Sequence, residues 1–423
     1  MFTTFNQAVE WIENSHRFGE KLDLVRMNLA CEILGHPERT FKSIHVAGTN
    51  GKGSTTNFIK NILLEAGYKV GIYTSPYVVS FNERIGINLN YISDEDVVYY
   101  ANSLKQLWDQ VYDEYQDSIT FFEILTLMSF LYFRDQKIDI AVVEVGLGGL
   151  LDATNVIDPL ISVITNISYD HMKQLGNTLE SIALNKLGIV KSNRPLVTTE
   201  DNPNLRGLFE MTCKAKNAPL IMINSDDISE VKVGQTTDFM FKQTRYKLQL
   251  TGLHQIKNAS LAIMCIDTLV NLKEIVVSER NIYQGLFMTK WPGRFEIFGG
   301  NIVIDGAHNI GGIESLISSL KLVYPHDKIK CLFCMMKDKE HYKIIGELDA
   351  IVDEFHFTQI DYYRSATAQE LYDESHHDIK YVHESAKEAF TMLKSTLKKN
   401  EVLVITGSLY FISYIRPFLV SNT

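Results

Sequence analysis

The chain has 423 residues, of which 45% are hydrophobic and 22% are charged, and its formal net charge is −10. This length suits two domains, and the composition is that of a globular protein rather than of a disordered or membrane-embedded one. The negative charge argues against nucleic acid or a lipid surface as a general partner, because either polyanion would be repelled on average. Five scattered cysteines are typical of thiols in a reducing compartment, so we expect a cytoplasmic protein.

The first half of the chain alternates short β-rich runs with helical stretches from residue 42 onward. Such continuous apolar runs predict a parallel sheet that is covered by helices on both faces. The most apolar long segment, residues 119–133, contains Glu123 and is short for a membrane span. We therefore expect a buried helix there.

The alternation of β-rich runs and helical stretches stops between residues 228 and 250. Closely spaced β-rich runs with polar breaks predict a small antiparallel patch there. A helix is expected to follow over residues 255–270, and the alternation of strands and helices restarts after residue 298. The predicted fold class is α/β. It comprises an N-terminal parallel-sheet domain over residues 1–297, which contains the candidate phosphate loop of an ATPase described next, and a C-terminal Rossmann-like α/β domain over residues 298–423.

The segment HVAGTNGKGSTTNF, residues 45–58, predicts a strand, a tight loop and a helix. Glycines let backbone amides crowd toward an anion, and the first turn of the helix leaves N–H groups without partners. Lys52 adds a mobile positive charge. The segment departs from G-x-x-x-x-G-K-[ST], because Val46 replaces the first glycine and Gly53 separates Lys52 from Ser54. The alternative is a glycine turn with a solvated lysine, but the strand before and the helix after favour nucleotide phosphate.

Polar side chains lie at the carboxyl ends of the predicted strands, where open α/β sheets bind ligands. Glu144 lies inside an apolar strand, and an ionised carboxylate there is costly unless it is paired or bound to a cation. Ser54, Ser75, Glu144 and His171 are all expected on the same side of one sheet, which favours an oxygen-rich Mg²⁺ site. The alternatives are a satisfied structural carboxylate for Glu144 and a helix-cap or core histidine for His171, since histidine is a less usual Mg²⁺ ligand.

Two further basic residues are candidates for the same site. Lys186, in IALNKLGIVK, is predicted by the sequence alone to be a solvated helix lysine. Near two cations it would have to contact phosphate or be carbamylated, because an ammonium cannot bind a metal. Arg294, in WPGR, could reach a phosphate with its planar guanidinium, and a structural hinge is the competing interpretation. Asp305 and His308, in VIDGAHN, come just before a helix of the second predicted domain.

The ordered set of motifs resembles the folylpolyglutamate synthase and dihydrofolate synthase family, within the Mur-type ligases. The segments that carry the resemblance are GTNGKGS, TSP with FNERI, TFFE, EVGLGG with LDATN, DH, NKLGIVK, HQIKNA, WPGRFE and DGAHN. This family's phosphate loop has Gly-Lys-Gly-Ser, which accounts for the displaced lysine. The resemblance implies an ATP-dependent ligase that activates a carboxylate as an acyl phosphate and joins it to the amino group of L-glutamate. The acceptor would be a folate, and also dihydropteroate, and the second domain would close over the ATP and glutamate sites.

The resemblance also implies roles for individual residues. The implied ATP contacts are Thr49, Asn50, Gly51, Lys52, Gly53, Ser54, Asn258, Arg294 and Asp305. The implied ligands of two Mg²⁺ ions are Ser54, Ser75, Glu144, His171 and a carbamylated Lys186. The implied pterin contacts are Thr120, Phe122 and Asp152, and the implied catalytic set is Lys52, Lys186, Arg294 and His308.

The acceptor side departs from the family pattern at two positions. Tyr77 stands where many members have histidine, and Leu150 where many have arginine. A muramyl peptide ligase is the alternative within the superfamily, and a non-catalytic nucleotide-binding paralogue is the alternative from another class. WPGRFE, DGAHN and TFFE favour the folate branch, whereas Leu150 favours the non-catalytic interpretation. We expect a monomer that binds ATP, L-glutamate and folate or dihydropteroate, and neither nucleic acid nor a membrane.

Overall fold

The computed structural model describes residues 1–16, 23–78 and 80–420. The chain divides into two compact units. The first comprises Met1–Asp227 and Asn258–Leu286, and the second comprises Ile228–Lys257 and Phe287–Thr423. The division falls inside two helices, α9 (Leu253–Asn271) and α10 (Glu279–Met288). Both units combine parallel strands with helices, so the predicted α/β fold class is confirmed.

The first unit is built on an eight-stranded sheet in the order β4-β3-β2-β5-β1-β6-β7-β8. Its strands from β2 to β8 in this order run parallel, and β3 and β4 add an antiparallel edge. The strands are β1 (Lys42–Ala47), β2 (Val70–Tyr73), β3 (Ile85–Ile87), β4 (Asn90–Tyr91), β5 (Ile140–Glu144), β6 (Ile161–Ile164), β7 (Leu196–Thr198) and β8 (Leu220–Met222). Because β1 lies between β5 and β6, the ends of strands far apart in sequence become neighbours.

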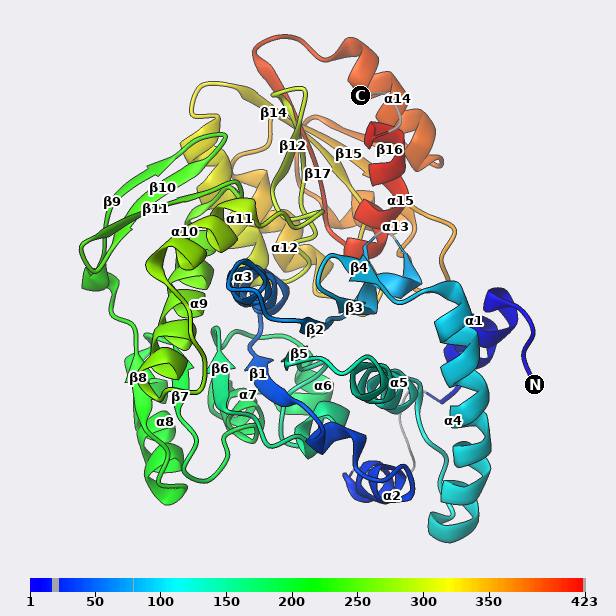
Figure 1. Ribbon diagram of the computed structural model, residues 1–423. Coiled ribbons are helices and arrows are strands. Elements are labelled where there is room, and N and C mark those ends of the chain that lie inside the picture. Colours follow the sequence, from blue (N-terminus) through cyan, green and yellow to red (C-terminus); the bar gives the residue numbers. More distant parts are fainter. Residues whose placement is uncertain (17–22, 79, 421–423) are drawn as a thin grey trace. The chain divides into compact units, whose positions relative to one another are not determined.

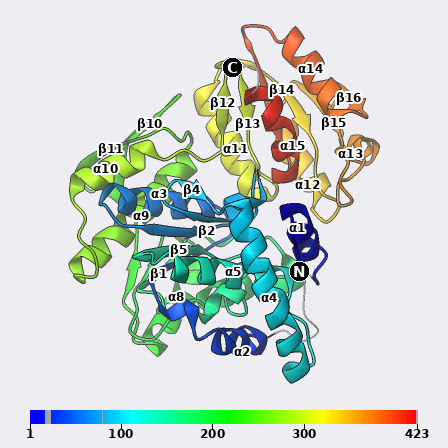
Figure 2. The same cartoon turned by 45° about the vertical axis from the view of Figure 1, so that its right-hand side comes forward.

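Helices cover both faces of this sheet (Figures 1 and 2). Besides α9 and α10, they are α1 (Phe5–Glu13), α2 (Val25–Ile33), α3 (Lys52–Glu65), α4 (Asp94–Tyr115), α5 (Phe121–Asp135), α6 (Met172–Leu175), α7 (Leu179–Leu187) and α8 (Pro203–Ala215). Short 3₁₀ turns are η1 (Pro37–Arg39), η2 (Phe81–Arg84), η3 (Ala153–Val156) and η4 (Ser225–Asp227). The helices between successive parallel strands provide the crossover connections that a parallel sheet requires.

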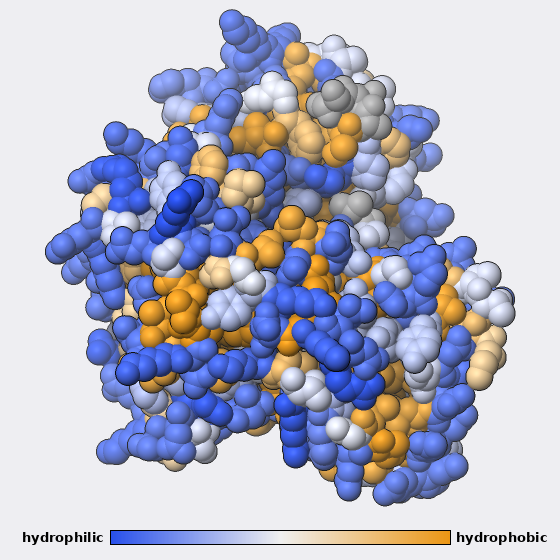
Figure 3. Space-filling model, viewed as in Figure 1, coloured by the Kyte–Doolittle hydropathy of each residue, from blue (hydrophilic) through white to orange (hydrophobic). Residues whose placement is uncertain are grey.

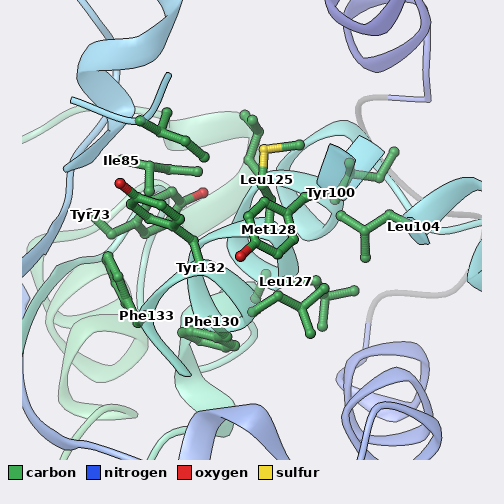
Figure 4. Packing of buried hydrophobic residues seen from close by; sticks show 14 of the residues in the cluster. Tyr73, Ile85, Tyr100, Leu104, Leu125, Leu127, Met128, Phe130, Tyr132 and Phe133 are labelled. Atoms are coloured by element: carbon green, nitrogen blue, oxygen red, sulfur yellow. The ribbon is translucent and has the colours of Figure 1, made fainter. Parts of the chain in front are cut away.

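Helix α5 is the buried helix that the sequence predicts over residues 119–133. Its N-terminus is fixed by a capping box, in which Thr120 and Glu123 satisfy each other's backbone amides. Its side chains Phe130 and Phe133 are fully buried, and Figure 4 shows them in one cluster with Tyr73 of β2. In the described residues no helix is long and apolar enough to cross a bilayer. On the face shown in Figure 3, hydrophobic residues occur in small groups among hydrophilic ones.

The second unit contains a six-stranded sheet in the order β12-β13-β17-β14-β15-β16 and a three-stranded antiparallel sheet in the order β11-β10-β9. The strands are β9 (Ile228–Val233), β10 (Thr237–Phe241), β11 (Thr244–Leu248), β12 (Glu296–Phe298), β13 (Ile302–Ile304), β14 (Lys328–Phe333), β15 (Glu354–Thr358), β16 (Lys380–His383) and β17 (Glu401–Thr406). The helices are α11 (Ile310–Val323), α12 (His341–Asp349), α13 (Ala368–Glu374), α14 (Ala386–Thr396) and α15 (Leu409–Val420).

The second unit takes in residues 228–257 and 287–297, which the sequence pattern assigned to the N-terminal domain. Two contacts explain the difference. Strand β12 pairs antiparallel with β13, so this sheet begins before residue 298. Strand β9 of the small sheet packs against α11, which comes much later in the chain. Sequence order alone does not reveal that an inserted hairpin packs with a later element.

A buried ion-pair network fixes the start of α5 in the first unit. The Arg26 guanidinium of α2 donates to both oxygens of Glu123, at 3.1 and 3.2 Å, and to Asp117 Oδ2 at 2.6 Å. All three side chains are buried. The arginine therefore compensates two carboxylates in a poorly solvated place, and removal of one partner from such a network is costly.

We expect Arg26→Met to destabilise the first unit by about 3–5 kcal/mol, because two buried carboxylates would lose their cation. Urea denaturation followed by fluorescence would measure the change, since Trp11 and Trp108 both lie in this unit. Arg206→Ala is the matched control: the Arg206–Glu210 pair is exposed, and its loss should change stability by about 0.5 kcal/mol or less. Equal midpoints for the two variants would contradict the expectation.

Candidate functional site

The phosphate loop joins β1 to α3 at the centre of the first sheet, as the sequence predicts. Gly51 caps α3 with φ 83°, and Gly48 has φ 147°, both in the region that disfavours side chains. A Cβ atom on Gly48 would lie 1.7 Å from Thr165 Oγ1, and one on Gly51 would lie 2.3 Å from Asn258 Oδ1. The glycines therefore let two neighbouring segments approach the loop, and Asn258 is brought to it as expected for one of the implied ATP contacts.

Two lysine side chains meet at a single backbone oxygen of this loop. Lys52 Nζ donates to Gly48 O at 3.0 Å and to Thr49 O at 3.2 Å, while Lys186 Nζ donates to Gly48 O at 2.9 Å. Lys186 is only 4% exposed, so the prediction of a solvated helix lysine is wrong. Burial, together with the Lys52 charge, lowers the pKa of Lys186 to about 7. Positive charge is thus concentrated where an anion would be stabilised.

The candidate metal ligands lie after neighbouring strands. Ser54 is buried in the first turn of α3, and Glu144 is buried at the end of β5, opposite Val46 of β1. The Ser75 backbone N–H donates to Glu144 Oε2 at 3.4 Å. His171 caps α6 in the left-handed conformation with a side chain that is 45% exposed, and its Nε2 lies 3.9 Å from Asp170 Oδ1.

These donors fit a hard cation better than a soft one. Nowhere in residues 1–16, 23–78 and 80–420 do three or more His, Cys, Asp or Glu side chains form a group that could hold a metal. Of the predicted ligands only Glu144 and His171 belong to those types, and Ser54 and Ser75 contribute hydroxyls. Carboxylate and hydroxyl oxygens suit Mg²⁺. Lys186, as an ammonium that donates to Gly48 O, could join them only after chemical conversion.

Two of the three candidate pterin residues, Phe122 and Asp152, contact the start of the loop after β5, and the third, Thr120, caps α5. The Phe122 ring lies against Gly146, where a Cβ atom would come within 2.4 Å of it, and its centroid is 5.7 Å from that of Tyr73. Asp152 is buried; its Oδ2 accepts from Leu147 N at 2.8 Å and its Oδ1 from Thr154 Oγ1 at 2.5 Å. Burial raises the pKa of Asp152, and these hydrogen bonds oppose the rise.

The second unit holds the remaining candidates in a local cluster. Asp305 is buried and accepts from Phe295 N and Ala307 N, both at 2.8 Å, so it ties the WPGR segment to the DGAHN segment. Burial raises the pKa of Asp305, and the Arg294 charge opposes this. The His308 Nδ1 lies 2.8 Å from Gly306 O, which makes Nδ1 the donor. Arg294 and Asp305 are electrostatic neighbours within this unit.

Known proteins match the chain along nearly its whole length. A model of the Mur ligase middle domain matches residues 46–266, and a model of the Mur ligase, glutamate ligase domain, matches residues 293–409. The dihydrofolate synthase/folylpolyglutamate synthase of Bacillus subtilis is 38% identical over 99% of this chain and 100% of its own length. This chain belongs to the dihydrofolate synthase/folylpolyglutamate synthase family of Mur ligases.

Solved structures of this family have the same fold. E. coli FolC in complex with DHPP and ADP gives a TM-score of 0.87 at 26% identity, over 99% of this chain and 98% of that one. An FPGS–AMPPCP–folate complex gives 0.85 at 30% identity, over 99% and 100%. Folylpolyglutamate synthase of Thermotoga maritima gives 0.84 at 34% identity, over 99% and 97%. These likenesses favour the folate branch over a muramyl peptide ligase.

The two departures from the dihydrofolate synthase/folylpolyglutamate synthase pattern have different surroundings. Tyr77 packs beneath the Arg84 guanidinium, 5.0 Å from its ring centroid, so it makes a cation–π contact. Leu150 is 48% exposed, and its backbone N–H donates to Asn185 O at 2.8 Å. Its position is therefore held by backbone contacts, and the leucine side chain contributes no charge there.

The sequence patterns did not point to residues 165–168, the segment that holds the phosphate loop in place. Thr165 and Asn166 follow β6 and hydrogen-bond to Asn50, and buried Glu200 supports them. The signal is present in TNIS, because polar residues directly follow a buried strand there, as Ser75 follows β2. Their partners, however, depend on the order of strands in the sheet.

Lys52→Ala should leave the fold intact and abolish turnover, because the charge acts on the transferred phosphoryl group more than on folding. Thermal melting beside ATP consumption would measure both effects, and we expect a loss of at least about a hundredfold in kcat/KM for ATP. Exposed Lys214→Ala on α8 is the control and should keep wild-type rates. A folded Lys52→Ala variant with near-normal turnover would exclude a phosphate-binding role for the loop.

Proposed function

We propose that this chain is an ATP-dependent ligase that adds L-glutamate to a folate and also to dihydropteroate, through an acyl phosphate. The convergence of Lys52 and Lys186 on Gly48 O carries the proposal, because it concentrates positive charge on a glycine loop at the N-terminus of a helix. The full-length relative is named for both activities. Related solved structures hold ADP with DHPP, or AMPPCP with folate.

The chemistry explains why ATP is needed. Joining a carboxylate to an amine in water is uphill, so transfer of the γ-phosphoryl group to the carboxylate provides a leaving group for attack by the amine of glutamate. Such a transfer depends chiefly on positioning and charge neutralisation. Lys52 would exchange its contacts with the Gly48 and Thr49 carbonyls for the terminal phosphates, and the first turn of α3 would donate backbone N–H groups. Asn258 would contact the nucleotide beside Gly51.

The oxygen ligands Ser54, Ser75 and Glu144 would hold Mg²⁺ with His171, and a second ion would be bound by carbamylated Lys186. Bound Mg²⁺ neutralises phosphate charge during the transfer. In support of the carbamate, carbamylation requires a neutral amine, and burial lowers the pKa of Lys186 to about 7. A carbamate also replaces the ammonium by oxygens, which are the ligands that a hard cation requires.

The second unit would contribute Arg294, Asp305 and His308 to ATP binding and catalysis. Asp305 orients the segment that carries Arg294 by accepting from Phe295 N, and a guanidinium is suited to phosphate oxygens. We also assign glutamate binding to this unit, since the model that matches residues 293–409 is that of a glutamate ligase domain. All five cysteines are free thiols, which is typical of a reducing compartment and supports a cytoplasmic location. We also propose that the protein is a monomer.

Thr120, Phe122 and Asp152 would receive the pterin ring. Phe122 offers an aromatic face for stacking. The Asp152 carboxylate already accepts hydrogen bonds from Leu147 and Thr154, so pterin N–H groups would share its remaining acceptor capacity. Exposed Leu150 cannot replace a bidentate cation for an acceptor carboxylate, and this makes the choice of acceptor the point that needs measurement.

The decisive experiment measures glutamate-dependent ADP release with dihydropteroate and, separately, with a reduced folate. We expect release with both acceptors and none when glutamate is omitted. Activity with the folate alone would restrict the chain to folylpolyglutamate synthesis. No release with either acceptor, in a protein that binds ADP, would overturn the proposal in favour of a non-catalytic nucleotide-binding protein.

The carbamate makes its own prediction. Lys186→Ala should be inactive and should regain part of its activity with a short-chain carboxylate, because the added carboxylate would restore oxygen ligands beside Gly48. Lys52→Ala is the matched control and should not be rescued, since its lost group is a cation. Full activity of Lys186→Ala, or equal rescue of both variants, would contradict a carbamate.

A further inference from the structure

The segment that follows β6, residues 165–168, holds the phosphate loop through five hydrogen bonds, one of which runs from Thr49 Oγ1 to Ser168 O at 3.1 Å. Asn166 accepts from Thr49 N through its backbone oxygen, at 2.9 Å, and from Asn50 N through its side-chain Oδ1, at 3.0 Å. Thr165 Oγ1 donates to Asn50 O at 2.6 Å. The Ser168 N–H donates to Thr49 Oγ1 at 3.0 Å. The conformation of Thr49 and Asn50 thus depends on the place of this segment, which we name the clamp.

The clamp is itself fixed by residues that follow β7. Glu200 Oε2 accepts from the backbone N–H of Ile167 at 2.6 Å, and its Oε1 accepts from Asn202 N at 3.0 Å. The hydroxyl of the preceding residue, Thr199, donates to Thr165 O at 2.6 Å. Since β6 and β7 are neighbours in the sheet, these contacts hold the clamp from the side opposite the phosphate loop.

The burial of Glu200 makes its hydrogen bonds strong and its position costly to disturb. Its side chain is only 6% exposed, and a buried carboxylate is tolerated when it accepts from several donors. Hydrogen bonds from backbone N–H groups to a carboxylate are shorter and stronger than neutral ones. A glutamine in its place has one oxygen, so its NH₂ group would face either the Ile167 or the Asn202 N–H, and that donor would lose its acceptor.

We propose that Glu200 is a positioning residue for ATP. It holds the clamp in the place from which Thr165 and Asn166 set the backbone of Thr49 and Asn50. Glu200 acts on Thr49 and Asn50 through two successive layers of hydrogen bonds. This inference rests on the proposed role of residues 49–54 in binding the ATP phosphates.

The test compares full-length Glu200→Gln with Glu38→Gln. Glu38 is 5% exposed in the same unit and pairs with His36 and Arg39, so it matches Glu200 in burial and type without contacting the clamp. We expect Glu200→Gln to raise the KM for ATP and the Kd for Mg–ADP by about tenfold, the factor for one buried donor left unsatisfied. Its KM for glutamate should stay within about twofold of wild type, as should all constants of Glu38→Gln.

The separation of KM from kcat distinguishes positioning from general destabilisation. A destabilised variant with less folded enzyme would lose apparent kcat for every substrate while its KM for ATP stayed unchanged, and this result would overturn the inference. If Glu200→Gln does not fold, Thr199→Val decides. It removes only the bond to Thr165 O and should raise the KM for ATP severalfold, whereas a wild-type KM would overturn the inference.

Failure of the proposed function gives a different pattern. If residues 49–54 do not bind phosphate, Lys52→Ala will bind Mg–ADP as tightly as wild type. If they do and Glu200 has no part in it, Lys52→Ala will lose Mg–ADP affinity while Glu200→Gln retains it. Calorimetry with Mg–ADP on wild type, Lys52→Ala and Glu200→Gln therefore distinguishes a failure of the proposed function from a failure of the inference about Glu200.

Discussion

The carbonyl oxygen of Gly48 accepts hydrogen bonds from the ammonium groups of Lys52 and Lys186. The glycine loop and helix α7 hold these groups in place. Two cations at one oxygen repel each other, which contributes to the lowered pKa of Lys186. The arrangement persists because the loop is built of glycines at positive φ and because α7 presents Lys186 from a buried position. An anionic ligand at this place would relieve the repulsion.

Support for the loop is arranged in layers across the sheet. The central strand β1 carries the loop, β6 carries the clamp that holds Thr49 and Asn50, and β7 leads to Glu200, which holds the clamp. Each layer uses polar groups at the carboxyl ends of parallel strands, where the fold gathers them. A rigid support of this kind matters for phosphoryl transfer, because positioning contributes a large part of the rate.

Among the candidate pterin residues, Thr120 and Asp152 also have structural roles. Thr120 caps α5, and Asp152 closes the loop after β5 through Leu147 and Thr154, while both are candidates for pterin contacts. The buried Arg26 network fixes the start of α5 and with it the place of Phe122. A change in this region would therefore alter stability and, with it, the position of the proposed acceptor contacts.

The α/β class, the strand–loop–helix around Lys52 and the family could be predicted from the amino-acid sequence, because they follow from local periodicity, glycine spacing and the order of motifs. Three of the residues that it named, Lys52, Lys186 and Asn258, lie at the loop. Two contacts could not be predicted in this way: Lys186 is buried against Gly48, 138 positions away, and Glu200 supports the clamp. The reason is physical: these contacts follow from the strand order β5-β1-β6-β7, which is set by packing of the whole sheet and leaves no mark on local sequence.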